Sequence, residues 1–397
     1  MTTNIPAPVH PSRLSLTALF LKFLRFGFLA FGGPVAQIAM IRQALVEDER
    51  WIDPARFNRL LAVLQILPGP EAHELCVHLG MVARGRVGGL LAGLGFMLPG
   101  MALMLLAGWL YVTWIAGDAG LSSLLLGVQI VVLAIILRAV VRIGEHIVED
   151  WLSGAIAVAS LIATLAGVPF WIPLVAAGLA YGASDRPLVA VAVLVVAIAA
   201  AAAVHGLAPS GATASAVAEP VTLAALFVAG LKGGMLTFGG AYTAIPYVRA
   251  DTVGRGWIGD ATFLDGIALA GVLPAPLVIF ATFVGYVAGG PGGALAITAG
   301  MFLPAFAFSL TLFERLEAVV ESPALHRLLA GVAAAVVGII AATFVQLGEA
   351  TGARISNGVA AGLLFGVALA AAWRLKGMWV TPALVAGGAI AGWLVMP

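Results

Sequence analysis

The chain has 397 residues, of which 62% are hydrophobic and only 10% are charged, and its formal net charge is +1. Soluble domains carry roughly 25% charged residues, so this composition excludes a soluble globular protein and indicates an all-α polytopic membrane protein embedded in the lipid bilayer. The near-neutral charge gives no sign of a nucleic-acid partner. The single cysteine, Cys76, excludes an intrachain disulfide.

Long apolar segments follow in chain order. A spanning helix needs about 20 mainly apolar residues. The candidates are 15–46, 88–116, 121–144, 152–168, 170–183 and 187–206 in the first half, and 221–250, 292–318, 325–347, 356–373 and 378–396 in the second. Residues 55–84 and 260–289 form two broken pairs, each interrupted by a Pro-x-Pro sequence. Lys22 and Arg25 interrupt the first apolar run and no small-residue cleavage site ends it, so we expect a retained segment and no cleaved signal peptide.

The two halves of the chain repeat one pattern. At an offset of 207 the first half matches the second at Phe20 and Phe227, Arg25 and Lys232, Gly32 and Gly239, and Arg42 and Arg249. After a one-residue deletion Trp51 matches Trp257, and Pro68 and Pro70 match Pro274 and Pro276. We therefore expect a first repeat at 12–206, a linker at 207–220 and a second repeat at 221–397. Segment 187–206 has no counterpart, and one extra crossing would invert the second repeat, unless the broken pairs are re-entrant.

Matched helix breaks are the main sign of a binding site. The first repeat carries Gly32-Gly33-Pro34 and Pro68-Gly69-Pro70, and the second carries Gly239-Gly240 and Pro274-Ala275-Pro276. A broken helix leaves backbone groups unpaired, which the bilayer tolerates only where the break faces protein or a polar cavity. The free N–H groups of a helix that restarts there bind anions. Gln37 and Tyr242 flank the breaks and can donate hydrogen bonds to oxyanion oxygens. The alternative is that these glycines only permit close helix packing.

A pair of basic residues, which we expect to be buried, precedes the glycine breaks. Arg25 lies seven residues before Gly32, and Lys232 lies seven before Gly239, so each shares a helix face with its break. A cation inside a spanning segment is costly and is a functional candidate. Two symmetry-related cations suit a small dianion. The alternative is snorkelling of the side chain to the membrane surface, which we expect of Lys22.

Other charged residues have less specific interpretations. We take Arg84 with Arg86, Arg138 with Arg142, and Arg186 as markers of the cytoplasmic side of the membrane. We expect Asp265, which aligns with Arg59, to face water near the start of its helix.

A polar cluster follows Pro70 in the first repeat only. Glu71, His73 and Glu74 are candidates for proton coupling, because histidine changes charge near neutral pH, although Glu71 is equally well explained as a helix cap. With His78 the cluster suggests a zinc site, but the five-residue spacing of the two histidines places them on different faces. The sequence contains no Walker loop, dinucleotide fingerprint or nucleophile elbow, so we expect no cofactor, no metal and no catalytic residue.

At these residues the sequence resembles the chromate ion transporter family in its two-domain form. The resemblance is carried by Arg25 to Pro34, by Leu67 to Ala72, and by weaker second-repeat forms at Phe238 to Gly240 and Leu273 to Pro276. It implies a multi-pass protein of the bacterial inner membrane that exports chromate, with two halves of opposite orientation. It assigns Arg25, Gly32, Gly33, Pro34, Pro68, Gly69, Pro70 and Glu71 to the motif positions. Ala241 and Ala275 replace the first repeat's Pro34 and Gly69, and His73 and Glu74 depart from the family pattern.

The sequence as a whole predicts a secondary transporter that exports chromate by alternating access and gives chromate resistance. Chromate and sulfate are both tetrahedral dianions, so a sulfate or other oxyanion carrier is the first alternative, and a passive anion channel is the second. An intramembrane metal-dependent enzyme built on His73, Glu74 and His78 is a weaker alternative, because the second repeat lacks these residues. The sequence also leaves open whether protons are co-transported and whether the chain forms a homodimer.

Overall fold

The fold was analysed in a computed structural model of the chain. It describes residues 14–64, 68–115, 119–186, 188–189, 192–193, 195–200, 220–238, 240–312, 323–375, 377 and 379–395. These residues form helices and connecting turns, with no strand among them. Half of the predicted extra span at 187–206 lies outside the described residues.

The first repeat contains these helices: α1 (Leu16–Phe28), α2 (Gly33–Arg42), the π-helical turn Gln43–Asp48, α3 (Pro54–Leu64), α4 (Glu71–Leu110), the π-helical turn Tyr111–Ile115, α5 (Ala119–Ile147), α6 (Trp151–Leu165) and α7 (Trp171–Gly182). The second repeat contains α9 (Leu223–Met235), the 3-10 turn Ala241–Ala244, α10 (Ile245–Thr252), α11 (Asp260–Val272), the 3-10 turn Leu277–Ile279, α12 (Phe280–Leu312), α14 (Pro323–Gly352), α15 (Gly358–Arg374) and α16 (Val380–Val395). The helix order of the first repeat thus recurs in the second.

Four helical stretches are long and apolar enough to cross a membrane: Glu71–Ile115, Leu121–Ile147, Leu277–Thr311 and His326–Gly352. Two of them contain a reversal. In α4 the reversal lies at Arg84 and Gly85, where Gly85 has a φ of 62°, and in α12 it lies at Gly289 and Gly290. After each reversal the chain runs back along the preceding helix. The membrane class predicted from composition is confirmed.

The glycine breaks reverse the chain as well. Lys22 of α1 forms an ion pair with Glu49, beyond α2, and Phe23 lies edge-on to Trp51. The chain therefore turns back at Gly32, so that residues before and after the break lie beside each other. In the second repeat Lys232 of α9 forms an ion pair with Asp251 of α10 in the same way. The predicted helix breaks at the glycine motifs are confirmed: the apolar segments 15–46 and 221–250 are re-entrant hairpins, because Gly32, Gly33 and Gly240 have positive φ values that a right-handed helix does not allow.

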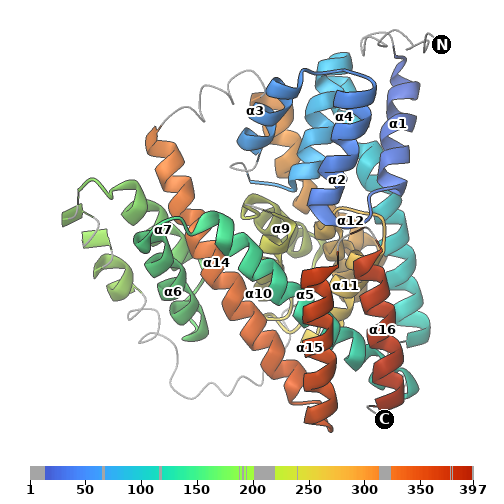
Figure 1. Cartoon of the computed structure of the whole chain (residues 1–397), viewed down its shortest axis with the longest axis vertical. Coiled ribbons are helices and arrows are strands. Elements are labelled where there is room, and N and C mark those ends of the chain that lie inside the picture. Colours follow the sequence, from blue (N-terminus) through green and yellow to red (C-terminus); the bar gives the residue numbers. More distant parts are fainter. Residues whose placement is uncertain are drawn as a thin grey trace.

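The repeats have opposite orientations, as predicted. Residues 86–110 of α4 and 290–312 of α12 are equivalent in the two repeats and pack together. A methyl group on Gly89 would lie 2.9 Å from Leu310 Cδ2, and one on Gly93 would lie 2.5 Å from Phe306 Cε1. Residue numbers rise along one helix while they fall along the other, so the two equivalent helices are antiparallel. In Figure 1, α1, α2 and α3 lie at the end of the molecule near the N-terminus, and α15 and α16 reach the end near the C-terminus.

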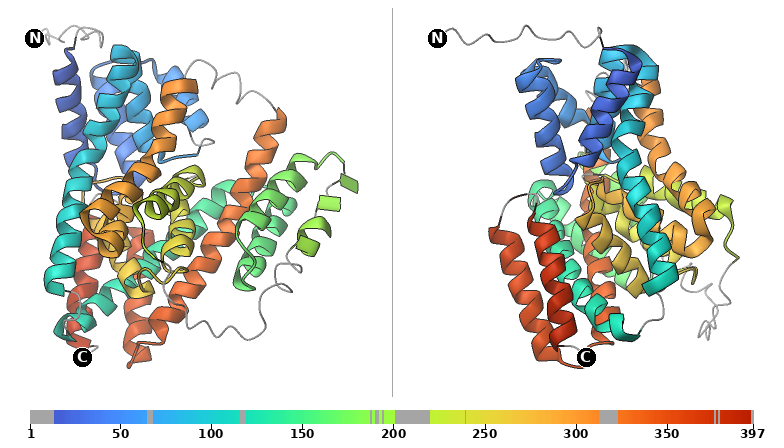
Figure 2. Two further views of the ribbon diagram at one scale, coloured as in Figure 1. Left: turned by 180° about the vertical axis from the view of Figure 1, so that it is seen from behind. Right: turned by 90° about the vertical axis from the view of Figure 1, so that its right-hand side faces the viewer.

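Each repeat packs its last two helices on the other repeat. The helices α6 and α7 contact α14, and α15 and α16 contact α5. Small residues allow the close approach: a methyl group on Gly331 of α14 would meet Tyr181 Cβ at 2.6 Å, and one on Gly127 of α5 would meet Gly392 Cα at 2.6 Å. Figure 2 shows α6 and α7 beside α14 on one side of the molecule, away from α15 and α16. Because helices of each repeat pack on a helix of the other, these contacts hold the two repeats together.

Arg138 and Arg142 lie inside α5, within the predicted span 121–144. The helix continues past both arginines to Ile147, beyond the predicted end at residue 144. Arg84, in contrast, lies at the reversal in α4 and donates to the carbonyl oxygen of Leu14 at 2.7 Å.

Candidate anion site at the helix breaks

The Gly-Gly-Pro break starts a helix with free donors. Gly32 and Gly33 have φ values of 83° and 79°, which L side chains rarely adopt. The helix α2 begins at Gly33 with Pro34 in its first turn, and no side chain caps it. Its first N–H groups and the positive end of its dipole are therefore available to an anion.

The first break of one repeat meets the second break of the other. Gln37 of α2 is buried and donates from Nε2 to the carbonyl oxygens of Ala30 and Ala275, both at 2.8 Å. Ala275 lies between Pro274 and Pro276. In this conformation the amide group of Gln37 thus donates to two backbone carbonyls, one from each repeat.

The converse contact is also present. The backbone N–H of Gly69, between Pro68 and Pro70, donates to the carbonyl oxygen of Thr237 at 2.9 Å. Thr237 lies just before the break of the second repeat, whose Gly239 is outside the described residues; Gly240 has a φ of 128°. The four breaks therefore converge, joined by one hydrogen bond in each direction between the repeats.

Glycine and alanine interlock at this meeting point. A methyl group on Gly100 would overlap Ala275 Cβ and lie 3.1 Å from Ala275 Cα. At the equivalent place in the other repeat, a methyl group on Gly69 would lie 3.4 Å from Ala305 Cβ. Each contact thus pairs one glycine with one alanine. In one contact the glycine lies on the long helix (Gly100), and in the other it lies in the Pro-x-Pro break (Gly69). The replacement of Gly69 by Ala275 between the repeats is therefore compensated on the facing helix, where the first repeat has Gly100 and the second has Ala305.

A small cavity of about 30 Å³ opens between the breaks. Its wall includes Gly32, Gly33, Ala275, Tyr242 and Thr381. This is room for about two water molecules, whereas a tetrahedral oxyanion carries four oxygens, so the cavity must widen to admit one. Thr381, at the start of α16, is a wall residue that the sequence did not reveal, because it is a lone hydroxyl in an apolar segment outside the repeated motifs.

The basic pair does not reach the cavity in this conformation. Arg25 is exposed on α1, so its predicted burial is wrong: it lies on the outward face of the helix. Lys232 is half-buried, and its Nζ pairs with Asp251 Oδ1 at 3.1 Å. Asp251 aligns with Ala44, so the first repeat offers no equivalent acid. The two basic residues align in sequence but differ in surroundings.

The polar cluster after Pro70 is buried. The acids Glu71 and Glu74 occupy the first turn of α4, where the helix dipole favours negative charge. A methyl group on Gly69 would overlap Glu74 Oε1. The Glu74 carboxylate accepts no hydrogen bond from the described residues. The His73 ring lies between Phe302 and Phe306 of the second repeat, with ring centres 4.9 and 4.8 Å away.

Asp265 differs from its expected position. It is buried in α11, where Oδ2 accepts from the Tyr111 hydroxyl and Oδ1 accepts from Gln129 Nε2, both at 2.9 Å. Arg354 donates in turn to Gln129 Oε1 at 2.9 Å. This network joins the two repeats on the side of the second repeat's re-entrant hairpins. Among the residues that the structure describes, no group of three or more His, Cys, Asp or Glu side chains could hold a metal ion.

The family model for chromate transporters matches residues 17–183 and 224–393. The chain is 54% identical over 402 residues to a chromate transport protein of Pseudomonas aeruginosa, covering 100% of this chain and 96% of that protein. It is 30% identical over 401 residues to a chromate transport protein of Cupriavidus metallidurans, covering 100% and 97%, and 27% identical over 407 residues to a probable chromate transport protein of Synechococcus elongatus, covering 97% and 96%. No solved structure matches the chain significantly. With two matched regions, an all-helical membrane fold and paired helix breaks, the chain belongs to the chromate transporter family.

Proposed function

We propose that this protein exports chromate across the bacterial cytoplasmic membrane by alternating access, and so gives the cell chromate resistance. The observation that supports this most is the convergence of the four helix breaks, joined by the Gln37–Ala275 and Gly69–Thr237 hydrogen bonds. Inverted repeats with broken helices at their interface are the usual construction of a secondary-transporter site. The names of the relatives supply the substrate.

The broken helices would hold the anion through backbone donors. In the proposed site the first N–H groups of α2, after Gly32 and Gly33, bind the oxyanion oxygens, and the Tyr242 hydroxyl donates from the other repeat. The units that move would be the repeats 12–206 and 221–397, joined by the linker 207–220. Because the two cross-repeat hydrogen bonds lie at the level of the breaks, that level is the natural pivot, and the cavity widens as one side opens.

We assign to Arg25 and Lys232 the role of balancing the two negative charges of the substrate. They would do so in the conformations in which the site is open to one side of the membrane. In the present conformation Lys232 is held by Asp251, and Arg25 is exposed and forms no ion pair with a described residue. Opening of a re-entrant hairpin changes the separation of α9 and α10 and so frees Lys232. Arg25 would face the entering anion from the first repeat. The dianion then meets one cation from each repeat.

Proton coupling is assigned to Glu71, His73 and Glu74. A charge on the buried Glu74 carboxylate would accept no hydrogen bond where it lies now, since no described residue donates to it. It would exchange its proton when the site opens to water. The rings of Phe302 and Phe306 link His73 to the opposite repeat, so movement between the repeats changes its surroundings.

Uptake of radiolabelled chromate into inverted membrane vesicles tests the proposal. Vesicles that contain the protein should accumulate chromate only when energised, an uncoupler should abolish the accumulation, and excess sulfate shows whether the site distinguishes the two dianions. Uptake equal to that of vesicles without the protein contradicts the proposal. Uptake that reaches equilibrium regardless of the uncoupler identifies a passive channel, and sulfate uptake without chromate uptake identifies a sulfate carrier.

A further inference from the structure

A cation on α5 lies on the helix face that packs toward the helix breaks. Arg138 is half-buried in the middle of the molecule's apolar helices. It follows Ala134 and Ile135 by four and three residues, so the three side chains share one face of α5. Ala134 and Ile135 belong to the apolar cluster against which the ring of Tyr242 packs. The face of α5 that carries Arg138 therefore turns toward Tyr242.

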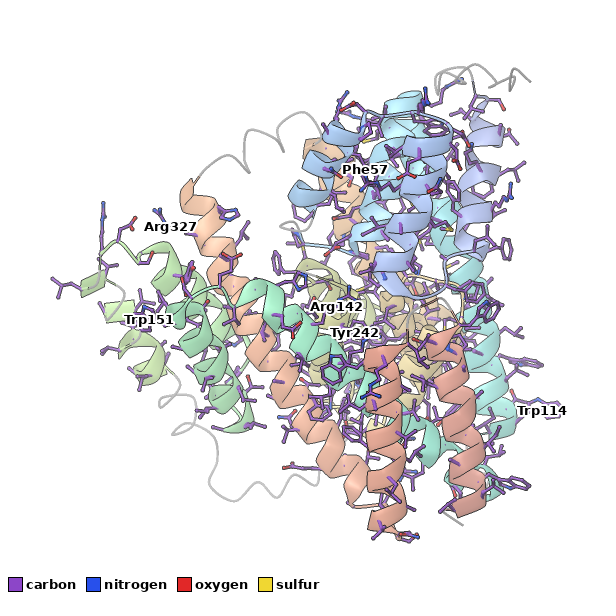
Figure 3. All side chains as sticks on the ribbon, in the orientation of Figure 1. Phe57, Trp114, Arg142, Trp151, Tyr242 and Arg327 are labelled. Carbon is purple, nitrogen blue, oxygen red and sulfur yellow. The ribbon has the colours of Figure 1, made fainter. Side chains whose placement is uncertain are left out.

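Tyr242 connects Arg138 with the proposed anion site. The Tyr242 side chain lines the cavity bounded by Gly32 and Gly33. It also lines the adjoining apolar cavity together with Ile135. Because Arg138 shares a helix face with Ile135, its guanidinium group lies on the side of α5 that is turned toward Tyr242. Figure 3 shows Tyr242 near the centre of the molecule and Arg142 on α5. Arg142 follows Arg138 by four residues, about one helical turn.

The charge of Arg138 is not balanced by an acid of the protein. Other partly buried cations in the described part of the chain have one: Lys22 pairs with Glu49, Lys232 with Asp251, and Arg249 with Asp260. Arg138 forms no ion pair and donates no hydrogen bond to a described residue. A half-buried cation within an apolar helix is costly unless an anion or polar partner compensates it. The missing partner here is a negative charge.

The guanidinium group matches the proposed substrate chemically. It presents several N–H donors in one plane and binds two oxygens of an oxyanion at once, which an ammonium group does not do. A tetrahedral dianion that widened the cavity between Gly33 and Tyr242 would bring its outer oxygens toward α5. Neither Arg25, which is exposed, nor Lys232, which is paired, supplies a cation on this side of the cavity.

We propose that Arg138 is a substrate-binding residue, whose guanidinium holds the oxyanion against the Tyr242 hydroxyl and the N-terminus of α2. This inference rests on the proposed transport function and adds to it a cation from outside the repeated motifs. The sequence alone assigned Arg138 no role in binding, because only the packing of α5 against the second repeat shows which way it faces.

The test compares Arg138→Gln with Arg142→Gln, a matched control that removes an exposed arginine one turn away on the same helix. Purified protein is measured for equilibrium binding of radiolabelled chromate, and inverted vesicles for the KM of chromate uptake. Loss of a charge-assisted hydrogen bond should weaken binding and raise KM at least about tenfold in Arg138→Gln. Arg138→Lys should recover part of the affinity, since it restores the charge but not the planar donor group. Arg142→Gln should behave as the wild type.

Several outcomes overturn the inference. Unchanged binding and unchanged KM in Arg138→Gln do so while wild-type uptake upholds the transport proposal. A fall in maximal rate with unchanged binding also does so, because it assigns Arg138 a structural role. If Arg138→Gln is not recovered as folded protein, Arg138→Met is measured for binding in its place. Wild-type protein that neither binds nor transports chromate overturns the transport proposal and this inference together.

Discussion

The close packing of Gly100 against Ala275 predicts that an added methyl group at residue 100 will destabilise the contact between α4 and the second Pro-x-Pro break. In Gly100→Ala the new methyl group overlaps Ala275 Cβ and lies 3.3 Å from the Pro274 carbonyl oxygen. Both neighbours belong to the backbone break, so neither can turn aside as a flexible side chain would. Overpacking of this kind costs about 1–3 kcal/mol. We expect a lower melting temperature in detergent and a matching loss of chromate uptake, because the break of the second repeat is pushed away from α4.

The double variant Gly100→Ala with Ala275→Gly should recover both properties. It places the glycine of the second break where the first break has Gly69, and it gives residue 100 the methyl group of Ala305, so it copies the contact that the other side of the protein already makes. The control is Gly348→Ala in α14, where an added methyl group meets nothing within 4 Å. If Gly100→Ala is as stable as the control, or the double variant is no better than the single one, the interlock plays no part in the fold.

Three further predictions concern the proposed site. Gln37→Glu keeps the side-chain shape but removes the donor to two backbone carbonyls. It should lower the free energy of unfolding by about 1–3 kcal/mol for each carbonyl left unpaired, and so lower the melting temperature. Wild-type stability of this variant would show that the cross-repeat hydrogen bond is dispensable. Arg25→Ala and Lys232→Ala should each lower the initial rate of chromate uptake about tenfold or more, with the protein still present in the membrane by immunoblot; full activity of both removes the pair from the site. His73→Gln should flatten the dependence of uptake on pH between about pH 6 and 8, and an unchanged profile would exclude His73 from proton coupling.

The positions of the breaks could be predicted from the sequence because glycine and proline act on the backbone itself. Gly32 and Gly33 adopt left-handed conformations, and α4 starts directly after Pro70. Alignment of the repeats also identified which breaks are equivalent. Family membership followed from the same residues, since the motif and the structural role coincide there.

What the sequence could not supply is which groups meet across the repeats. The pairing of Gln37 with Ala275, and of Gly69 with Thr237, joins residues that are far apart in the chain and unlike in type. The direction in which a helix residue faces also depends on packing. Arg25 was expected to be buried and is exposed, while Arg138 lies half-buried in α5 on the face turned toward Tyr242. Neither orientation leaves a local signal in an apolar sequence.

The central claim is that the converging breaks form the anion site. A structure of the protein with chromate bound, recorded with anomalous scattering at the chromium absorption edge, tests it most directly. The account predicts a single strong chromium peak between Gly33 and Tyr242, within reach of the α2 N-terminus and Arg138. A peak elsewhere, such as on the outer face of α1 beside Arg25 with the cavity between the breaks empty, would contradict it.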